Sequence, residues 1–174
     1  MSHISFSELK IWNECAFKHK LVYIDEVKKF LGNEYTAFGT AVHEVCEKSV
    51  LGEIDKSFSV LNECFSNKFL EELKKLTEKK VELNKDLVGK MRTQAGKLLP
   101  YIVPSLIEYF DEYEVVSAEE KLYEPLGDNL YFKGFIDLVL KTSDGKYHVI
   151  DWKTCSWGWD TKRKTDRMTT YQLT

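Results

Sequence analysis

The sequence has few of the residues that interrupt regular structure: its 174 residues include only three prolines and nine glycines. Because 43% of the residues are hydrophobic and 30% are charged, the composition is typical of an ordered globular protein and excludes a disordered one. No apolar run approaches the roughly 18 residues that cross a bilayer. The opening residues, MSHIS, lack the charged and apolar regions of a signal peptide. We therefore expect a cytoplasmic protein with no membrane partner.

Cysteine is also sparse, and its spacing is uninformative for metal binding. Cys15, Cys46, Cys64 and Cys155 form no C-x-x-C pair, so neither a zinc site nor a disulfide framework is indicated. Cys46 and Cys64 occupy apolar helical positions, where we expect core residues. The net charge of -3 excludes a generally basic nucleic-acid coat, although local phosphate contacts remain compatible with it.

Two segments near the C-terminus, residues 131–140 and 146–153, are rich in β-branched and aromatic residues. The turn-forming sequence SDG at residues 143–145 lies between them, so the pair is predicted to form a hairpin. Asp151 and Lys153 are two residues apart and therefore point to the same face of a strand. The alternative is an exposed hairpin with incidental charges.

The register of this hairpin decides whether Asp137 and Asp151 can meet. A two-residue loop, Asp144-Gly145, would place them on opposite faces of the sheet. A three-residue loop, with a type I turn and Gly145 in the left-handed conformation, places Asp137 directly across from Asp151. We predict the second register.

A helix is predicted to open at the sequence GTAVHEV, residues 39–45. Its apolar stripe contains Val42, Val45, Cys46, Ser49 and Val50 at helical spacing. His43 falls at the border of this stripe, where its side chain can project along a groove. The alternative for such a residue is a purely structural histidine.

The rest of the chain is predicted to contain helices followed by strands. Ser5-x-x-Glu8 is a capping box for a first helix, and later helices run over residues 57–80 and from about Asn84, with a turn between Thr77 and Asp86 and a kink or break at Pro100 and Pro104. Strands are expected at 113–125, 129–141 and 146–154. The first helix is expected to bury Phe6, Leu9, Trp12 and Ala16; the second is expected to bury Phe58, Leu61, Phe65, Phe69, Leu73 and Leu76.

Taken in order, these motifs resemble the RecB-like branch of the PD-(D/E)XK nuclease superfamily, which includes the RecB and AddB nuclease domains, lambda exonuclease and the CRISPR-associated RecB-like nucleases. The resemblance spans nearly the whole chain, from SFSEL at residues 5–9 with Cys15 and Tyr23, through GTAVHE at 39–44, to GFID at 134–137, DWKT at 151–154 and YQL at 171–173. Glu120 matches the acidic residue of the family's first strand, although Glu119 can be aligned instead.

The resemblance implies an α/β fold: a restriction-endonuclease-like core in which a small mixed sheet is flanked by helices, with an N-terminal helical portion. We expect one domain over 1–174, mainly helical over 1–110, with the catalytic sheet and the start of a further helix over 111–174. Because the family's last helix continues beyond Tyr171-Gln172-Leu173, we expect the natural product to be longer, or another chain to complete the sheet by self-association or as a protein partner.

The resemblance also implies a metal-dependent DNA nuclease, with one or two Mg²⁺ or Mn²⁺ ions, acting as an exonuclease in recombination, repair, or phage or CRISPR DNA processing. His43, Asp137, Asp151 and the Trp152 backbone carbonyl would hold the metal, and Lys153 would activate water. Gln172 would position the lysine or water, and Glu120 would support a second metal. An iron-sulfur cluster is not expected, because the C-terminal cysteine trio of some family members is absent.

The segment after the catalytic strand, residues 157–167, interleaves indoles with cations. Indoles stack on unpaired bases and cations neutralise phosphates. We predict DNA contacts from Trp157, Trp159, Lys162, Arg163, Lys164, Arg167 and Tyr171; the alternative is a solvated loop. Two rival functions remain: a catalytically idle nucleic-acid-binding or scaffold module on the same fold, and an unrelated hydrolase that acts without nucleic acid.

Overall fold

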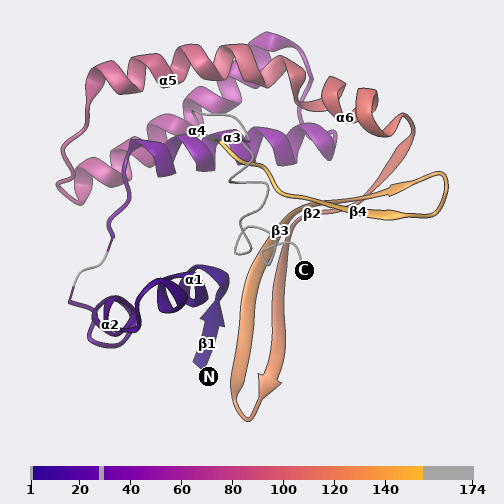
Figure 1. The fold of residues 1–174 in the computed structure, drawn as a ribbon. Helices are drawn as coiled ribbons and strands as arrows, with labels where there is room; N and C mark the ends of the chain where they lie inside the picture. The colour runs from indigo at the N-terminus through magenta and orange to yellow at the C-terminus, as the bar shows by residue number, and fades with distance from the viewer. Residues whose placement is uncertain (1, 28–29, 155–174) are drawn as a thin grey trace. The chain divides into compact units, whose positions relative to one another are not determined.

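The computed structural model describes residues 2–27 and 30–154 of the chain (Figure 1). Its internal contacts divide it into two compact units. The helical unit consists of Leu31–Ala118 and Asp137–Thr154. The hairpin unit contains Met1–Phe30 and Glu119–Ile136, and it also includes Cys155–Thr174, which lie outside the described residues. The expectation of one domain over the whole chain stays a prediction.

The helical unit begins with α3 (Glu34–Val50), which starts five residues before the helix expected at Gly39. A reciprocal capping box explains the earlier start: the Asn33 side chain accepts the Thr36 N–H at 3.1 Å, and the Thr36 hydroxyl accepts the Asn33 N–H at 2.9 Å. Glu34 is buried and accepts the Asn84 N–H at 2.6 Å. This contact fixes the start of α3 against the start of the later helix α5.

The next helix, α4 (Phe58–Glu78), confirms the long amphipathic stretch expected over 57–80. It packs along α3, as Figure 1 shows, and its buried residues are Leu61, Phe65, Phe69, Leu73 and Leu76. Phe58 is the exception, because its side chain is 54% exposed. The centre of this core is aromatic: Phe38 of α3 meets Phe65 edge to face, with ring centroids 5.7 Å apart. Cys46 is buried as expected, and Cys64 is partly buried against the same core.

Helix α5 (Lys85–Leu98) is capped by Asn84, whose side chain accepts the Leu87 N–H at 3.1 Å. The chain then turns through a short 3₁₀ segment, Leu99–Tyr101, and continues as α6 (Ile102–Phe110). The break expected at Pro100 is confirmed, because proline cannot donate the hydrogen bond that would continue α5. Pro104 is tolerated in the first turn of α6, where N–H groups lack helical partners.

Four strands form one mixed sheet in the order β1–β3–β2, with β4 also pairing with β3. The long strands β2 (Tyr113–Gly127) and β3 (Leu130–Thr142) run through both units, whereas β4 (Tyr147–Ile150) belongs to the helical unit. In that unit, Leu106 of α6 packs on Leu138 and Leu140 of β3 to form a second core cluster. The mixed α/β class and the small sheet with flanking helices confirm the expected fold.

The hairpin unit begins with β1 (Ser2–Ser5), which the sequence patterns did not indicate and which pairs in parallel with β3, His3 opposite Tyr131. Helices α1 (Phe6–Glu14) and α2 (Ala16–His19) and a π-helical turn (Lys20–Ile24) follow. Ser5 caps α1 by accepting the Glu8 N–H at 3.3 Å. The Glu8 carboxylate contacts His19 Nε2 at 2.8 Å.

The expectation that the first helix buries Phe6, Leu9, Trp12 and Ala16 is wrong. No residue of α1 is buried, and Trp12 is 57% exposed. For Ala16 the physical reason is a break at Cys15, which adopts an extended conformation with φ -164°. Ala16 therefore starts a separate helix, and the four side chains do not form one stripe. Among the described residues, no helix combines the length and the apolar character needed to cross a membrane.

Candidate metal centre

The β3–β4 hairpin has the register that brings Asp137 opposite Asp151. Its ladder pairs Leu138 with Ile150 and Leu140 with His148, and the next pair in this register is Asp137 with Asp151. The turn has Gly145 at φ +81°, and the Thr142 N–H donates to the Lys146 carbonyl at 3.0 Å. The predicted three-residue loop with a left-handed glycine is confirmed.

The strand β4 ends at Ile150, four residues earlier than expected, and Asp151–Thr154 have no regular structure. Asp137 accounts for the change. The Trp152 N–H donates to its carboxylate, with N to Oδ2 at 2.7 Å, so a side chain replaces the backbone partner of a regular ladder. The Trp152 side chain packs against both core clusters of the helical unit. The Asp151–Thr154 segment is therefore held in two ways, by the hydrogen bond of the Trp152 N–H and by the packing of the Trp152 side chain.

His43 of α3 reaches this segment from the other side. Its Nε2 lies 3.0 Å from the Trp152 carbonyl oxygen, and its Nδ1 lies 3.6 Å from Asp137 Oδ2. The side chains of His43 and Asp137 are 26% and 11% exposed, so both are shielded while still accessible from solvent. Val42 and Val45 beside His43 are buried, which matches the border position expected on the helix.

Gly39 permits the close approach of α3 to this segment. A Cβ atom added at Gly39 would lie 3.3 Å from Thr154 Oγ1, a tighter contact than most real Cβ atoms make. The helix can therefore bring His43 against Trp152 because one turn earlier it presents no side chain. The spacing of Gly39 and His43 suggested a motif, but the role of Thr154 was not visible in the sequence.

Asp151 and Lys153 form an ion pair with Lys153 Nζ 2.6 Å from Asp151 Oδ1. The Asp151 side chain is 18% exposed and the Lys153 side chain is 37% exposed. The two charges expected on one side of the chain thus meet, although the backbone between them is not a strand. The ion pair therefore joins the two residues on either side of Trp152 in the sequence.

An acidic and basic network lies next to His43 on α3. Glu44 accepts from Lys48 Nζ at 2.6 Å and pairs with Lys68 of α4 at 3.3 Å. The hydrogen bond from Lys48 lowers the pKa of Glu44, with a further lowering from Lys68 that opposes the effect of burial. Glu44 therefore stays ionised at neutral pH and links α3 to α4.

The two acidic residues considered on β2 differ in environment. Glu120, chosen from the sequence, is exposed, whereas Glu119 is partly buried and has φ +48°. A left-handed glutamate within a strand is uncommon and marks a local irregularity. The predicted role of Glu120 stays a prediction.

Several predicted functional residues lie outside the described part of the chain. They are Trp157, Trp159, Lys162, Arg163, Lys164, Arg167, Tyr171 and Gln172.

Two comparisons with known proteins bear on this geometry. A family model described as the PD-(D/E)XK nuclease superfamily matches residues 3–174. No curated protein sequence matches the chain. The matched range contains the positions of His43, Asp137, Asp151 and Lys153, all of which belong to the helical unit.

Proposed function

This chain belongs to the PD-(D/E)XK nuclease superfamily, and we propose that it is a metal-dependent deoxyribonuclease that hydrolyses phosphodiester bonds. The observation that carries the proposal is the convergence of the His43 imidazole, the Asp137 carboxylate and the Trp152 carbonyl in the helical unit. An exonuclease acting in DNA recombination, repair, or phage or CRISPR DNA processing is the specific role we favour from the RecB-like motifs.

The donor atoms fit a divalent cation. The His43 Nε2–H donates to the Trp152 carbonyl oxygen at 3.0 Å. A cation that replaced this proton would find the two atoms at a suitable separation, because ligands at right angles, each about 2.1 Å from an ion, lie about 3.0 Å apart. An oxygen-rich set suits Mg²⁺, and one imidazole adds affinity for Mn²⁺. We propose His43, Asp137, Asp151 and the Trp152 carbonyl as the residues that hold one ion.

Glu119 is a further candidate ligand, since its carboxylate supplies a donor of the same kind as Asp137. It follows Ala118, which packs with the second core cluster of the helical unit. We retain Glu120 as the alternative acidic residue for a second ion, and the exposure of its side chain makes Glu119 the first of the two to substitute.

A bound divalent cation would supply charge neutralisation of the phosphate oxygens and a water of lowered pKa. The protein's own residues would supply orientation. Lys153, paired with Asp151 at 2.6 Å, keeps its ammonium at a defined place, where it would orient the attacking water and stabilise developing negative charge. Asp137 receives the Trp152 N–H and so keeps its second oxygen in a fixed direction. Gln172 is proposed to help position the lysine or the water.

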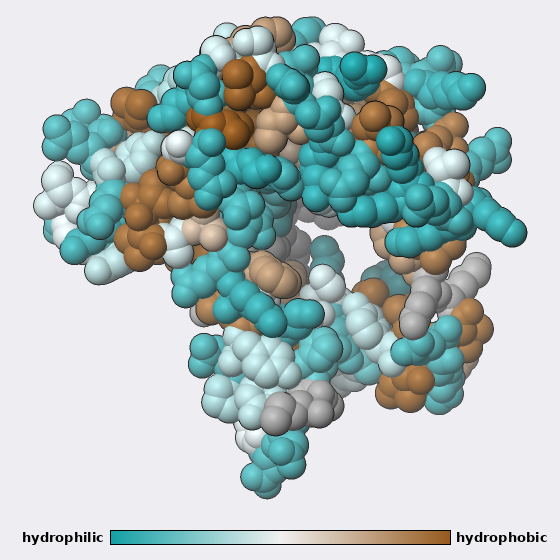
Figure 2. Space-filling view, turned by 180° about the vertical axis from the view of Figure 1, so that it is seen from behind, coloured by the Kyte–Doolittle hydropathy of each residue, from teal (hydrophilic) through white to brown (hydrophobic). Residues whose placement is uncertain are grey.

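The hairpin unit carries side chains suited to nucleic acid. Tyr123 and Tyr131 stack with centroids 4.7 Å apart, and Lys121 lies over the Tyr123 ring at 5.7 Å. Lys133 lies 6.0 Å from the centre of Phe135, which is 58% exposed. Figure 2 shows the end of this hairpin, at the bottom of the view, in hydrophilic to intermediate colours. Exposed rings with adjacent cations bind unpaired bases and phosphates together.

We propose that these five residues contact DNA, in addition to the predicted contacts from residues 157–167 and Tyr171. Phe135 precedes Asp137 by two residues in the same strand, so the aromatic contacts adjoin the candidate site along the chain. The rival function, a catalytically idle nucleic-acid-binding module, would use the same surface without cleavage.

One experiment separates these functions. The chain is incubated with single- and double-stranded DNA and with Mn²⁺, Mg²⁺ or a chelator, and acid-soluble nucleotides are measured alongside binding by fluorescence anisotropy. We expect metal-dependent release that the chelator abolishes. Binding without release at saturating metal would support the idle module, and neither binding nor release would refute the nucleic-acid assignment.

A matched pair of variants tests the proposed DNA contacts. Tyr123→Ala should weaken single-strand binding by about five- to 100-fold, because one base stack contributes about 1–3 kcal/mol. Tyr101→Ala is the control, since Tyr101 is 67% exposed and lies in the helical unit. Equal losses in the two variants would count against the hairpin as a DNA contact.

A further inference from the structure

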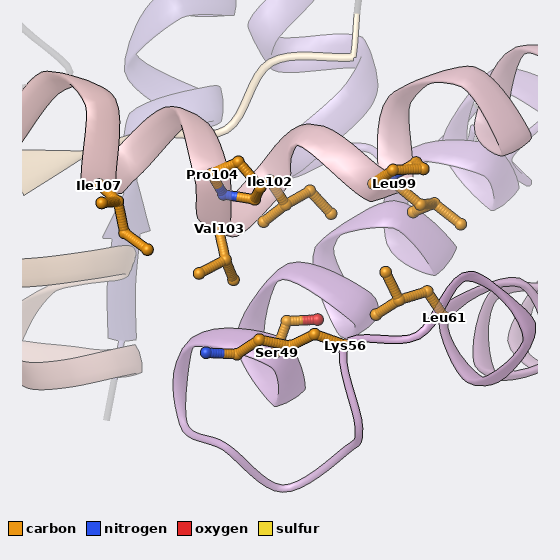
Figure 3. Close-up of a pocket in the computed structure, with 9 residues that line it drawn as sticks. Ser49, Lys56, Leu61, Leu99, Ile102, Val103, Pro104 and Ile107 are labelled. Atoms are coloured by element: carbon orange, nitrogen blue, oxygen red, sulfur yellow. The ribbon is translucent and has the colours of Figure 1, made fainter.

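A small pocket in the helical unit lies among α3, α6 and the start of α4 (Figure 3). Its volume is about 190 Å³, and seven of its nine lining residues are apolar. Leu61 of α4 and Leu99, Ile102, Val103 and Ile107 near α6 form most of the wall. The two remaining lining residues, Ser49 and Lys56, are polar.

Ser49 is the first of these residues. Its side chain is 1% exposed, and its hydroxyl has no hydrogen-bond partner among the described residues. Buried hydroxyl groups are nearly always paired, because an unpaired one loses its hydrogen bonds to water without replacement. Figure 3 shows the hydroxyl directed toward the side of the pocket where Leu61 lies. A ligand group able to hydrogen-bond would satisfy it.

Lys56 is the second. It is exposed, and among the described residues its ammonium has no carboxylate partner. The adjacent Asp55 carboxylate accepts the Ser57 N–H at 2.7 Å, so it forms a local hydrogen bond within the turn before α4. Figure 3 places the ammonium below Val103, pointing away from the Ser49 hydroxyl. The pocket therefore has an apolar middle, a hydroxyl toward one end and a cation toward the other.

We propose that this pocket binds a small aromatic carboxylate, with the ring among the apolar side chains, the carboxylate at Lys56 and a second polar group at Ser49. The size agrees with this class, because an apolar protein cavity of about 150 Å³ accommodates benzene. A pocket of about 190 Å³ leaves room for a ring with small substituents. The proposal is independent of the nuclease function, since it uses none of the residues of the candidate metal centre.

Calorimetry on the full chain tests the proposal, with 4-hydroxybenzoate, benzoate and 4-hydroxybenzylamine as probes. We expect 4-hydroxybenzoate to bind with one-to-one stoichiometry. Benzoate, which cannot pair with Ser49, should bind about two- to tenfold more weakly, the range for one net hydrogen bond. The amine should bind more weakly than 4-hydroxybenzoate, because its charge matches that of Lys56.

Variants distinguish a ligand-binding pocket from one in which the Ser49 hydroxyl is simply left unpaired. Ser49→Ala should bring the affinities for 4-hydroxybenzoate and benzoate together, and it should raise the melting temperature of the ligand-free protein by removing an unpaired buried hydroxyl. Lys56→Gln should weaken both carboxylates by up to about fivefold, the range for an exposed ion pair. Lys90→Gln is the matched control, because Lys90 is exposed on α5 and does not line the pocket.

The proposal is overturned if neither carboxylate binds saturably, if the amine binds as tightly, or if Lys56→Gln and Lys90→Gln have the same effect. A crystal structure in which an ordered water pairs with Ser49 and stays there in the presence of 4-hydroxybenzoate would also overturn it.

Discussion

The Trp152 N–H donates to the Asp137 carboxylate with N to Oδ2 at 2.7 Å, and this bond ends the β3–β4 ladder. A backbone group that would otherwise continue a strand is thereby used to orient an acidic side chain. The Trp152 carbonyl then turns to His43, whose Nε2 lies 3.0 Å away. One residue therefore connects the acidic strand to the helix that carries the imidazole.

The Asp137→Asn variant tests the negative charge of Asp137 separately from its hydrogen bond with the Trp152 N–H. The asparagine oxygen can still accept the Trp152 N–H, so the melting temperature should change by only a few degrees. Loss of the negative charge should abolish Mn²⁺ binding in calorimetry and reduce cleavage at least 100-fold. Undiminished Mn²⁺ affinity would remove Asp137 from the ligand set.

His43 is expected to set the metal preference. With an imidazole ligand, activity in Mn²⁺ should exceed activity in Mg²⁺. His43→Ala should weaken Mn²⁺ binding and narrow the difference between the two ions, as measured by metal titration of cleavage. An unchanged titration would assign His43 a structural role only.

Lys153 distinguishes an enzyme from a binding module. Lys153→Ala leaves both carboxylates in place, so Mn²⁺ should still bind while cleavage falls by about two or more orders of magnitude. Asp151→Asn should lose both properties, because it changes a proposed ligand. The pair is compared by calorimetry and single-turnover cleavage, and retained activity in Lys153→Ala would contradict the assigned role.

Gly39 is expected to affect activity through its close contact with Thr154 rather than through the stability of the helix. Gly39→Ala favours the helix by up to about 1 kcal/mol, yet its Cβ would lie 3.3 Å from Thr154 Oγ1 and shift the segment that faces His43. We expect unchanged or higher thermal stability with about tenfold lower activity. Thr154→Ala in the same chain should restore activity, and failure of this rescue would show that the contact is unimportant.

The Glu44 network gives a pH dependence of stability. Lys48 and Lys68 lower the pKa of Glu44 in the folded protein below its ordinary value of 4.5. Its stabilising contribution is therefore fully present above that value and is lost as the pH falls through the lower, folded pKa. Glu44→Gln should cost about 1 kcal/mol in urea unfolding at neutral pH.

The difference between wild type and Glu44→Gln should shrink as the pH falls below 4.5. Glu78→Gln is the control, because Glu78 is exposed at the end of α4 and makes no described contact with these lysines. A difference that stays constant down to pH 3 would contradict a role for Glu44 ionisation.

Local sequence patterns determined the hairpin register, the buried face of one helix and the end of another. Period-two alternation and the SDG turn were sufficient to place Asp137 opposite Asp151, because a turn with Gly145 in the left-handed conformation leaves only one register. Helical periodicity likewise located the buried face of α4, and Pro100 located the end of α5. These features depend on neighbours within a few residues, so the sequence contains their cause.

The remaining features depend on residues far apart in the chain, and only the tertiary structure decided them. The contact of His43 with Trp152 joins positions 109 residues apart, and the close approach of Gly39 to Thr154 spans a similar separation. The early end of β4 follows from the Asp137 side chain, and the unpaired Ser49 hydroxyl follows from how α6 packs over α3. No periodicity predicts such contacts, because they arise when separate elements compete for the same backbone groups and the same space.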